Sequence, residues 1–495
     1  MAEGEGQGTT GRRVAMAALL LAASQLLSRL MGFVREAVLA WQVGVGPQAD
    51  AYQAAFQIPD LLNYFLAGGA LGIAFIPLYQ RAREREGEEA AERLLATVLG
   101  TLGAAVVAAT VLLFAFAEEL VAFQFRAFSP DELALTTRMT RIVLPAQIAF
   151  FAGGVVRAAL MARGRFAAQA VAPVVYNGGI ILGGVLLAPR IGVEGFAWGA
   201  LAGAFAGPLG AALLEARGRV RLGLRVAPGS AAFRRYLALA APLLLGVSLL
   251  TVDEWYDRWF GQLVGTGAIG LLFYARRLMQ VPVAAVGQTV ATAALPALSR
   301  LHEQGRAEEL GALLQRTLQA SLGVALLAAG GLAACATPVV TLVYVRGAFL
   351  PADAGPVAAA LAVFCAAVPG WVLQQVAVRA FYARGEMWTP MLLGTGVSLA
   401  AIPLYLVAAG FGPTGLAAAG ALAISVNALA TLGLARQRHG APALGPLLAS
   451  GARGLGAVAP AAAAAWWVQG ARPGALGALL DLALGGAVYL AVAAA

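Results

Sequence analysis

The chain has 495 residues, of which 60% are hydrophobic and 12% are charged, and its mean hydropathy is +0.78. Soluble globular proteins carry about 25% charged residues, so this composition excludes an ordinary soluble domain. The net charge of +9 would suit a nucleic-acid binder, but the arginines lie mostly in short loops and at the ends of apolar runs. We therefore expect an all-α polytopic membrane protein that binds no nucleic acid.

The apolar runs predict about 14 transmembrane helices, each near or above the ~20 residues that a bilayer requires. They lie near residues 14–42, 49–80, 92–118, 133–161, 167–188, 194–215, 236–263, 268–298, 310–345, 353–381, 390–410, 414–435, 446–468 and 474–494. Arginines are concentrated in alternate loops, beginning with Arg12 and Arg13, so we expect both termini to be cytoplasmic. No small-residue cleavage site follows the polar tail, and we expect the first run to be retained as a span.

Short motifs recur along the chain with nearly constant spacing. Ala162-Arg163-Gly164 recurs as Ala383-Arg384-Gly385, and Gly192-Val193 recurs as Gly412-Pro413. The spacing of the repeat corresponds to an even number of spans. This predicts two parallel six-helix lobes related by an axis along the membrane normal. We expect a tail at 1–13, lobes at 14–215 and 236–435, a basic cytoplasmic linker at 216–235, and two further helices within 436–495.

Two lobes around a central cavity are typical of a transporter that works by alternating access. The matching first pairs of spans carry charges at membrane depth, where they are expensive and mark functional sites. The candidate substrate-binding residues are Ser28, Arg29, Arg35, Glu36, Asp50, Arg276 and Arg277. Arginine binds phosphate through a planar fork of donors, so these arginines suit a diphosphate. The alternative is that Arg35 pairs with Glu36 or Asp50 only to hold the bundle together.

Asp253 and Asp257 are four residues apart on one helix face. They suit a coupling cation, either a sodium ion or a proton, and the alternative is that they pair with Arg258 or with the cavity arginines. Cys335 and Cys365 lie in apolar runs, and we expect buried free thiols, with a disulfide or a metal pair as the alternative. No metal site is firmly assigned and no other cofactor is expected.

The residues Ser28-Arg29-Leu30-Met31-Gly32-Phe33-Val34-Arg35-Glu36 resemble the first-span motif of the MurJ (MviN) family of bacterial lipid II flippases. Further matches are Asp50-Ala51-Tyr52, Pro59-Asp60-Leu61-Leu62 and Tyr274-Ala275-Arg276-Arg277-Leu278-Met279. The resemblance covers nearly the whole chain, including the last two spans. It implies the fold of the multidrug, oligosaccharidyl-lipid and polysaccharide exporters and a place in the bacterial inner membrane.

The resemblance also implies a role for individual residues. Ser28, Arg29, Arg35, Glu36, Asp50 and Arg277 match the family's cavity residues. The arginines would receive the headgroup of lipid II, and spans 13 and 14 would help to form a groove for its undecaprenyl tail. One departure is Asn63-Tyr64, where many members carry two arginines. We expect a monomer that contacts the lipid bilayer and cell-wall synthesis proteins.

Other functions compete with this interpretation. The chain could flip another polyprenyl-diphosphate-linked oligosaccharide, or it could be a cation-coupled multidrug exporter, although acids do not dominate its cavity. A membrane transferase would need a catalytic motif, and Asp253-Glu254 stands without a companion, so we do not expect an enzyme. A membrane potential that is negative inside would favour outward movement of an anionic headgroup, by about 2.3 kcal/mol per charge per 100 mV.

Overall fold

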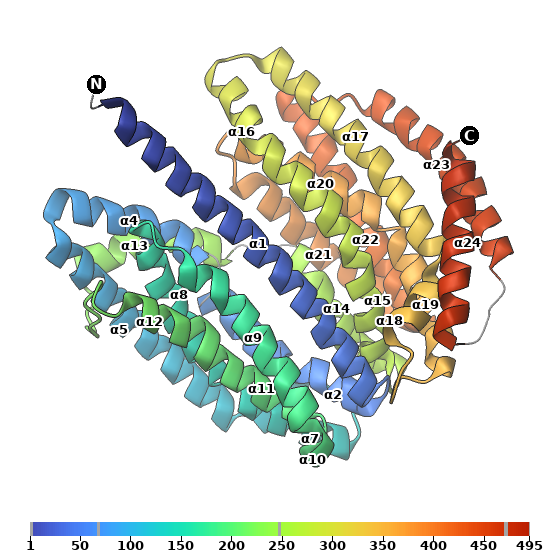
Figure 1. The fold of residues 1–495 in the computed structure, drawn as a ribbon, viewed down its shortest axis with the longest axis horizontal. Helices are drawn as coiled ribbons and strands as arrows, with labels where there is room; N and C mark the ends of the chain where they lie inside the picture. The colour runs from blue at the N-terminus through green and yellow to red at the C-terminus, as the bar shows by residue number, and fades with distance from the viewer. Residues whose placement is uncertain (1–2, 67–69, 246–248, 470–473, 495) are drawn as a thin grey trace. The chain divides into compact units, whose positions relative to one another are not determined.

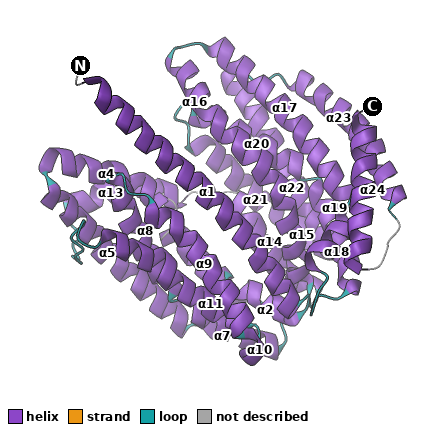
Figure 2. Ribbon diagram, in the orientation of Figure 1, coloured by secondary structure: helices purple, strands orange, loops and turns teal. Residues whose placement is uncertain are grey.

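The computed structural model describes residues 3–66, 70–245, 249–469 and 474–494. Within these ranges every regular element is a helix and no strand occurs (Figure 1; Figure 2). The predicted all-α fold class is confirmed.

The helices follow one another along the chain with short connections. The first half contains α1 (Glu3–Val43), α2 (Pro47–Ala55), α3 (Gln57–Leu66), α4 (Ala70–Glu86), α5 (Glu88–Ala115), α6 (Ala117–Gln124), α7 (Pro130–Val143), α8 (Ala146–Ala162), α9 (Ala167–Leu186), α10 (Ala188–Ile191), α11 (Glu194–Ala204), η1 (Phe205–Ala211), α12 (Ala212–Ala216) and α13 (Ala231–Leu245). The second half contains α14 (Leu249–Val264), α15 (Ala268–Pro282), η2 (Val283–Gln288), α16 (Thr289–Glu303), α17 (Ala307–Ala334), α18 (Ala336–Tyr344), α19 (Pro351–Cys365), α20 (Val368–Tyr382), α21 (Trp388–Ala409), α22 (Gly412–His439), α23 (Leu444–Val468) and α24 (Gly474–Ala494).

Ten helical stretches of the described chain are long and apolar enough to cross a membrane, or eleven if the bent pair α19 and α20 counts as one span. The chain is therefore a multi-pass membrane protein. The predicted number of about 14 spans is not confirmed by this criterion. One reason is that the range 49–80 is interrupted at Phe56, between α2 and α3. The ranges 49–80 and 236–263 also include residues outside the described ranges.

Proline explains where the second predicted span is broken. A proline inside a predicted span is expected to interrupt the helix near its own position, here at Pro59-Asp60. The helix breaks earlier, at Phe56, and both Pro59 and Asp60 lie in the first turn of α3. Proline has no backbone N–H and its ring clashes with the carbonyl four residues earlier, which here is that of Ala55. The Thr140 hydroxyl donates a hydrogen bond to this Ala55 oxygen at 3.2 Å. Thr140 therefore satisfies the carbonyl that the proline leaves without a partner.

The chain divides into two compact units. The first comprises residues 1–43 and 51–245, and the second comprises residues 44–50 and 246–495. The division at Leu245 lies beyond residue 236, where we expected the second lobe to begin. The reason lies in α13, which packs on α4 and α5. Its Tyr236 is fully buried in the same apolar cluster as Phe75 and Tyr79, and the Phe75 and Tyr236 rings are 6.4 Å apart.

Glycines bring α9 and α11 into close contact in the first unit (Figure 1). A Cβ atom on Gly199 would lie 2.5 Å from the Gly179 oxygen and 2.9 Å from Gly183 Cα. Small residues at this spacing allow helix backbones to approach closely, as is common between membrane helices. The contact fixes α9, which carries part of the candidate site.

The repeated motifs occupy equivalent turns in the two units. Gly164 follows α8 with φ +72°, and Gly385 follows α20 with φ +76°. Each turn contains an equivalent backbone hydrogen bond. The Arg165 amide donates to the Leu160 carbonyl in the first unit, and the Glu386 amide donates to the Phe381 carbonyl in the second. A positive φ favours glycine, which explains why this residue recurs in both copies of the motif.

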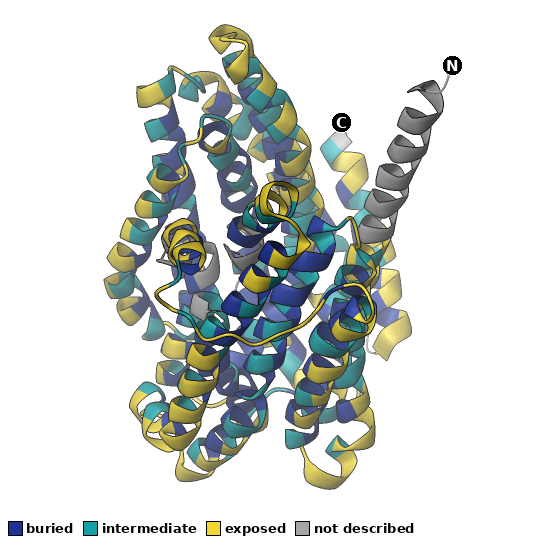
Figure 3. Ribbon diagram, turned by 90° about the vertical axis from the view of Figure 1, so that its left-hand side faces the viewer, coloured by how far each residue is buried: buried dark blue, intermediate teal, exposed yellow. Residues whose placement is uncertain are grey.

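Individual helices carry buried residues along one side and exposed residues along the other (Figure 3). Many of the exposed side chains are large and apolar, including Leu214, Leu224, Phe411 and Trp467. A large apolar surface is expected where the surrounding solvent is lipid. Trp466 and Trp467 are 70% and 82% exposed at the end of α23, which fits an interfacial aromatic belt.

Candidate functional site

The polar cluster of the first unit is centred on Arg35 of α1. Arg35 Nη2 donates to Glu36 Oε1 at 2.5 Å, and its Nη1 donates to Asn177 Oδ1 at 3.1 Å. The Arg35 side chain is 22% exposed, whereas that of Glu36 is 4% exposed. A buried carboxylate and a buried amide thus hold part of the guanidinium, and its remaining surface is accessible to a ligand. The predicted pair of Arg35 and Glu36 is present, and it leaves Arg35 partly exposed.

Asn177 of α9 was not among the residues selected from the sequence. Its Nδ2 donates to the backbone oxygen and to the Oγ of Ser28, both at 3.4 Å, and to the Pro173 oxygen at 3.1 Å. The side chain therefore connects Ser28 with Arg35 across the packed pair α1 and α9. The sequence did offer a signal for Asn177. A polar side chain in the middle of an apolar span marks a candidate functional residue, and the only other side-chain amide in α9 is that of Gln169, near its start.

Arg29 lies six residues before Arg35 on α1 and is exposed. At 3.6 residues per turn the two side chains differ by about 120° around the helix axis. The first unit therefore brings together Ser28, Arg35 and Glu36, with Arg29 at a neighbouring position on the same helix.

Asp50 binds the start of α15 in the second unit. The amide of Gly267 donates to Asp50 Oδ2 at 2.5 Å, and the amide of Gly270 donates to Oδ1 at 2.7 Å. Asp50 is 1% exposed. Its carboxylate thus accepts two of the free amides at the start of α15, where the helix dipole also favours a negative charge. These contacts give Asp50 a positioning role for α15.

Arg276 of α15 is enclosed in a buried network. Its Nε donates to Asp257 Oδ2 at 2.5 Å, and its Nη1 pairs with Asp253 Oδ2. The hydroxyl of Tyr405 on α21 donates to the other Asp253 oxygen. The side chains of Arg276, Asp253 and Asp257 are only 3–6% exposed. The two aspartates therefore pair with Arg276, one of the candidate cavity arginines, and the enclosure does not favour the predicted contact of Arg276 with a substrate.

Arg277 points in a different direction from its neighbour. Its Nη1 donates to Gln280 Oε1 at 3.0 Å and lies 4.0 Å from Glu254 Oε1, and its guanidinium stacks 4.9 Å from the Phe273 ring. The Arg277 side chain is 29% exposed, compared with 5% for Arg276. Consecutive helical residues are about 100° apart, so α15 presents one arginine to the protein interior and the other to an accessible face.

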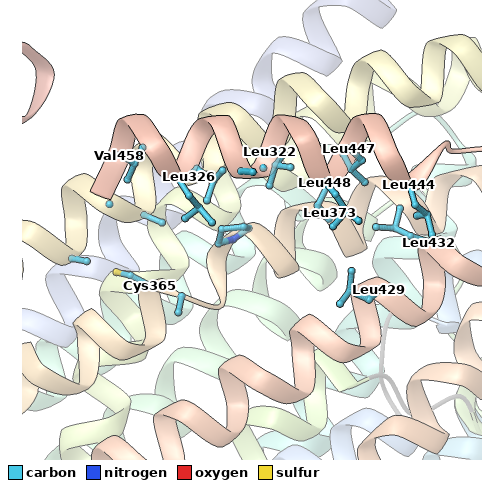
Figure 4. A pocket seen from close by; sticks show the side chains of 18 of the residues that line it. Leu322, Leu326, Cys365, Leu373, Leu429, Leu432, Leu444, Leu447, Leu448 and Val458 are labelled. Carbon is cyan, nitrogen blue, oxygen red and sulfur yellow. The ribbon is translucent and has the colours of Figure 1, made fainter. Parts of the chain in front are cut away.

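An apolar pocket lies in the second unit (Figure 4). Its volume is about 760 Å³, and it is lined by α17, the bend between α19 and α20, α22 and α23. Leucines dominate the lining, among them Leu322 and Leu326 of α17 and Leu447 and Leu448 of α23. Cys365 also lines it, and both Cys365 and Cys335 are buried free thiols, as predicted. The shape and chemistry suit an alkyl or isoprenoid chain.

Relatives of known family show where this chain belongs. A profile of the family described as lipid II flippase MurJ matches residues 39–483. A probable lipid II flippase MurJ from Rhizobium meliloti is 30% identical over 75% of this chain and 71% of that protein. A lipid II flippase MurJ from Burkholderia cenocepacia is 28% identical over 77% of this chain and 75% of that protein.

Solved structures share the fold. A lipid II flippase MurJ in an inward closed conformation has a TM-score of 0.81 at 22% identity, covering 96% of this chain and 98% of that one. An inward-facing MATE family transporter of the MOP superfamily has a TM-score of 0.71 at 15% identity, covering 86% of this chain and 98% of that one. The family match over most of the chain, with this shared fold, shows that the chain belongs to the MurJ family of lipid II flippases.

Proposed function

We propose that this protein carries lipid II across the bacterial cytoplasmic membrane, from the inner to the outer leaflet, and that Arg35 and Arg277 bind its diphosphate. The observation that carries the proposal is that the Arg35 guanidinium is both oriented by its neighbours and accessible. Buried Glu36 and Asn177 orient its guanidinium, which remains 22% exposed. An oriented and accessible fork of donors is what recognition of a phosphate requires.

The second unit contains an accessible arginine of its own. Arg277 is 29% exposed and is restrained by Gln280 and Glu254. Exposed Arg29 adds a third positive group on α1. Arginines that are partly paired with carboxylates cost less to hold at membrane depth than unpaired ones. The paired acids thus keep the arginines in place when no substrate is bound.

The lipid tail requires an apolar path that leaves it close to the bilayer. The leucine-lined pocket beside α23 has the chemistry for an isoprenoid chain. We infer that α23, the thirteenth predicted span, contributes to the groove, whereas none of the described α24 residues lines this pocket. The protein acts as a monomer with cytoplasmic termini, and the membrane potential favours export of the anionic headgroup.

Complementation tests the proposal. The wild-type gene and the variants Arg29→Ala, Arg35→Ala and Arg277→Ala are expressed in bacteria depleted of their own lipid II flippase. Membrane levels of each variant are measured by immunoblotting. Rescue by the wild type and failure of Arg35→Ala and Arg277→Ala at equal membrane levels support the proposal. Failure of an expressed wild type argues for another substrate, and equal rescue by all three variants means that the arginines are structural.

A further inference from the structure

Arg157 of α8 is a charged residue of the first unit that the headgroup site described above does not use. It lies within the apolar stretch Pro130–Ala162, which is long enough to cross a membrane, and it is half-buried. Its Nε donates to the Gln169 side-chain oxygen at 3.0 Å, and its Nη1 donates to the Pro208 carbonyl at 2.6 Å. Two neutral oxygens, one on α9 and one on η1, therefore hold the guanidinium in place.

These contacts orient the positive charge of Arg157 without neutralising it. Arg35 and Arg277 each lie beside a glutamate, whereas the hydrogen-bond partners of Arg157 in the described ranges include no acid. A charge within a membrane span is expensive and marks a functional site. An uncharged donor could serve two neutral acceptors equally well, so the arginine indicates that this position receives an anion.

The third nitrogen of the guanidinium, Nη2, points back along α8. Among the described residues, and apart from the α8 backbone, a Cβ atom on Gly154 would have one neighbour within 4 Å, Arg157 Nη2 at 3.9 Å. Nη2 thus lies about one turn before its own Cα, beside open space, and not near the end of α8, where a long side chain would reach the membrane surface. It donates to no residue of the described chain, so its N–H groups are available to a ligand.

One side of the packed helices α8 and α9 connects Arg157 with the Arg35 cluster. Phe150 and Arg157 are two turns apart and lie on the same side of α8. The Phe150 ring packs against the Tyr176 ring of α9 at 5.1 Å. Tyr176 directly precedes Asn177, which accepts a hydrogen bond from Arg35. Arg157 and Arg35 therefore border one continuous surface of the first unit.

The spacing along α9 shows how far apart the two cations are held. Gln169 binds Arg157, and Asn177, eight residues later, binds Arg35. At 1.5 Å per residue these amides are about 12 Å apart along the helix. A diphosphate is much shorter than this separation. A ligand that contacts both guanidinium groups must therefore carry a second anionic group.

We propose that Arg157 binds a carboxylate of the substrate's peptide while Arg35 binds the diphosphate. The inference rests on the proposed function, in which the substrate is lipid II, because the headgroup of lipid II joins a disaccharide-peptide to the diphosphate. A carboxylate fits the planar fork of an arginine as a phosphate does. Gln169 and Pro208 act as positioning residues that keep Nη2 directed at the ligand.

The test compares the binding of lipid II with that of undecaprenyl diphosphate, which has no peptide, to the purified protein in detergent. Arg157→Gln should bind lipid II about tenfold more weakly than the wild type and should bind undecaprenyl diphosphate normally. Arg35→Gln should lose affinity for both ligands. Arg163→Gln is the control and should match the wild type with both. Equal losses for the two ligands in Arg157→Gln, or no loss for lipid II, would overturn the proposal.

A second measurement does not depend on the folding of Arg157→Gln. The wild type and the charge-retaining variant Arg157→Lys are titrated with lipid II whose peptide carboxylates are methyl esters. The wild type should bind this ester about tenfold more weakly than lipid II, and Arg157→Lys should keep part of the difference. A wild type that binds the ester and lipid II equally would contradict the role of Arg157 alone. A wild type that binds neither lipid II nor undecaprenyl diphosphate would contradict the proposed function itself.

Discussion

Asn177 shows how one polar side chain determines the position of a functional one. It accepts a hydrogen bond from Arg35 and donates to Ser28, and it is 8% exposed. With Glu36 on one side and Asn177 on the other, the Arg35 guanidinium loses little further freedom when a phosphate binds. Such preorganisation improves binding because the entropic cost has already been met during folding.

Replacing Asn177 by alanine should therefore impair substrate binding more than folding. A hydrogen bond to a charged group contributes about 1.5–3 kcal/mol, so we expect lipid II binding to weaken about tenfold or more. Binding is measured by titrating labelled lipid II into the purified variant. Ser24→Ala is the matched control, because it removes another hydrogen bond between α1 and α9, to the Ala170 oxygen. Equal affinity in Asn177→Ala and the wild type would contradict the role of Asn177.

At the scale of elements, α15 begins without a cap from its own sequence. Its N-cap residue is Gly267, with φ +87° and no side chain to accept a hydrogen bond. Asp50, which lies far earlier in the chain, provides both acceptors. The same helix carries Arg276 and Arg277, so the position of two important arginines depends on this distant carboxylate.

Asp50→Ala should lower the stability of the protein. Each buried amide left without an acceptor costs about 1–3 kcal/mol, so the loss of both acceptors predicts about 2–6 kcal/mol. Asp50→Asn, which retains one carbonyl oxygen, should cost about half as much. The control is Asp353→Ala, which removes a more accessible acceptor at the start of α19 and should cost about 1 kcal/mol. Chemical unfolding in detergent measures all three, and equal losses for Asp50→Ala and Asp353→Ala would refute the account.

The contact of α9 with α11 predicts a second effect at this scale. Gly199→Leu places a side chain against the Gly179 oxygen and Gly183 Cα, both backbone atoms that cannot move away easily. Overpacking usually costs about 1–3 kcal/mol, and displacement of α9 should also reduce flipping by moving Asn177. Gly178→Ala is the control, since its Cβ would meet only Met31 Cε, at 3.5 Å. Normal stability and activity of Gly199→Leu would show that the close approach is unimportant.

At the scale of the whole molecule, the charge of the substrate should couple transport to the membrane potential. Each charge that crosses 100 mV gains about 2.3 kcal/mol when the potential is negative inside. Flipping by proteoliposomes that contain the protein should therefore be faster with a potassium–valinomycin potential of this sign than with none. Reversing the potential serves as the control and should slow flipping. Rates that do not depend on the potential would argue against net movement of charge.

The sequence allowed the class of protein and its family to be predicted, because long apolar runs with charges inside them are typical of membrane transporters and the first-span motif resembles the family. It did not allow the partners of the charges to be predicted. Arg276 and Arg277 are adjacent and chemically identical, and only the packing of α14, α21 and α22 shows that one is enclosed and the other accessible. Asp50 and Asn177 likewise bind groups that are distant in the sequence.

The ends of individual helices could not be predicted accurately from the sequence for a related reason. The effect of Pro59 on α2 depends on the carbonyl four residues earlier, so the break falls at Phe56. The position of α13 depends on Tyr236, whose apolar partners Phe75 and Tyr79 lie in a different helix. Hydropathy gives the same value to such residues whichever unit they join, and the contacts of the folded chain decide between the two.

The measurement that tests the central claim most directly is the flipping of fluorescently labelled lipid II by proteoliposomes that contain the wild type, Arg35→Gln or Arg163→Gln. Arg163 is a suitable control because it pairs with Glu88 at 2.6 Å in the turn after α8, away from the Arg35 cluster. We predict that the wild type and Arg163→Gln flip at similar rates and that Arg35→Gln is slower by about tenfold or more. A wild type that does not flip lipid II, or an Arg35→Gln variant that flips it as fast, would contradict the account.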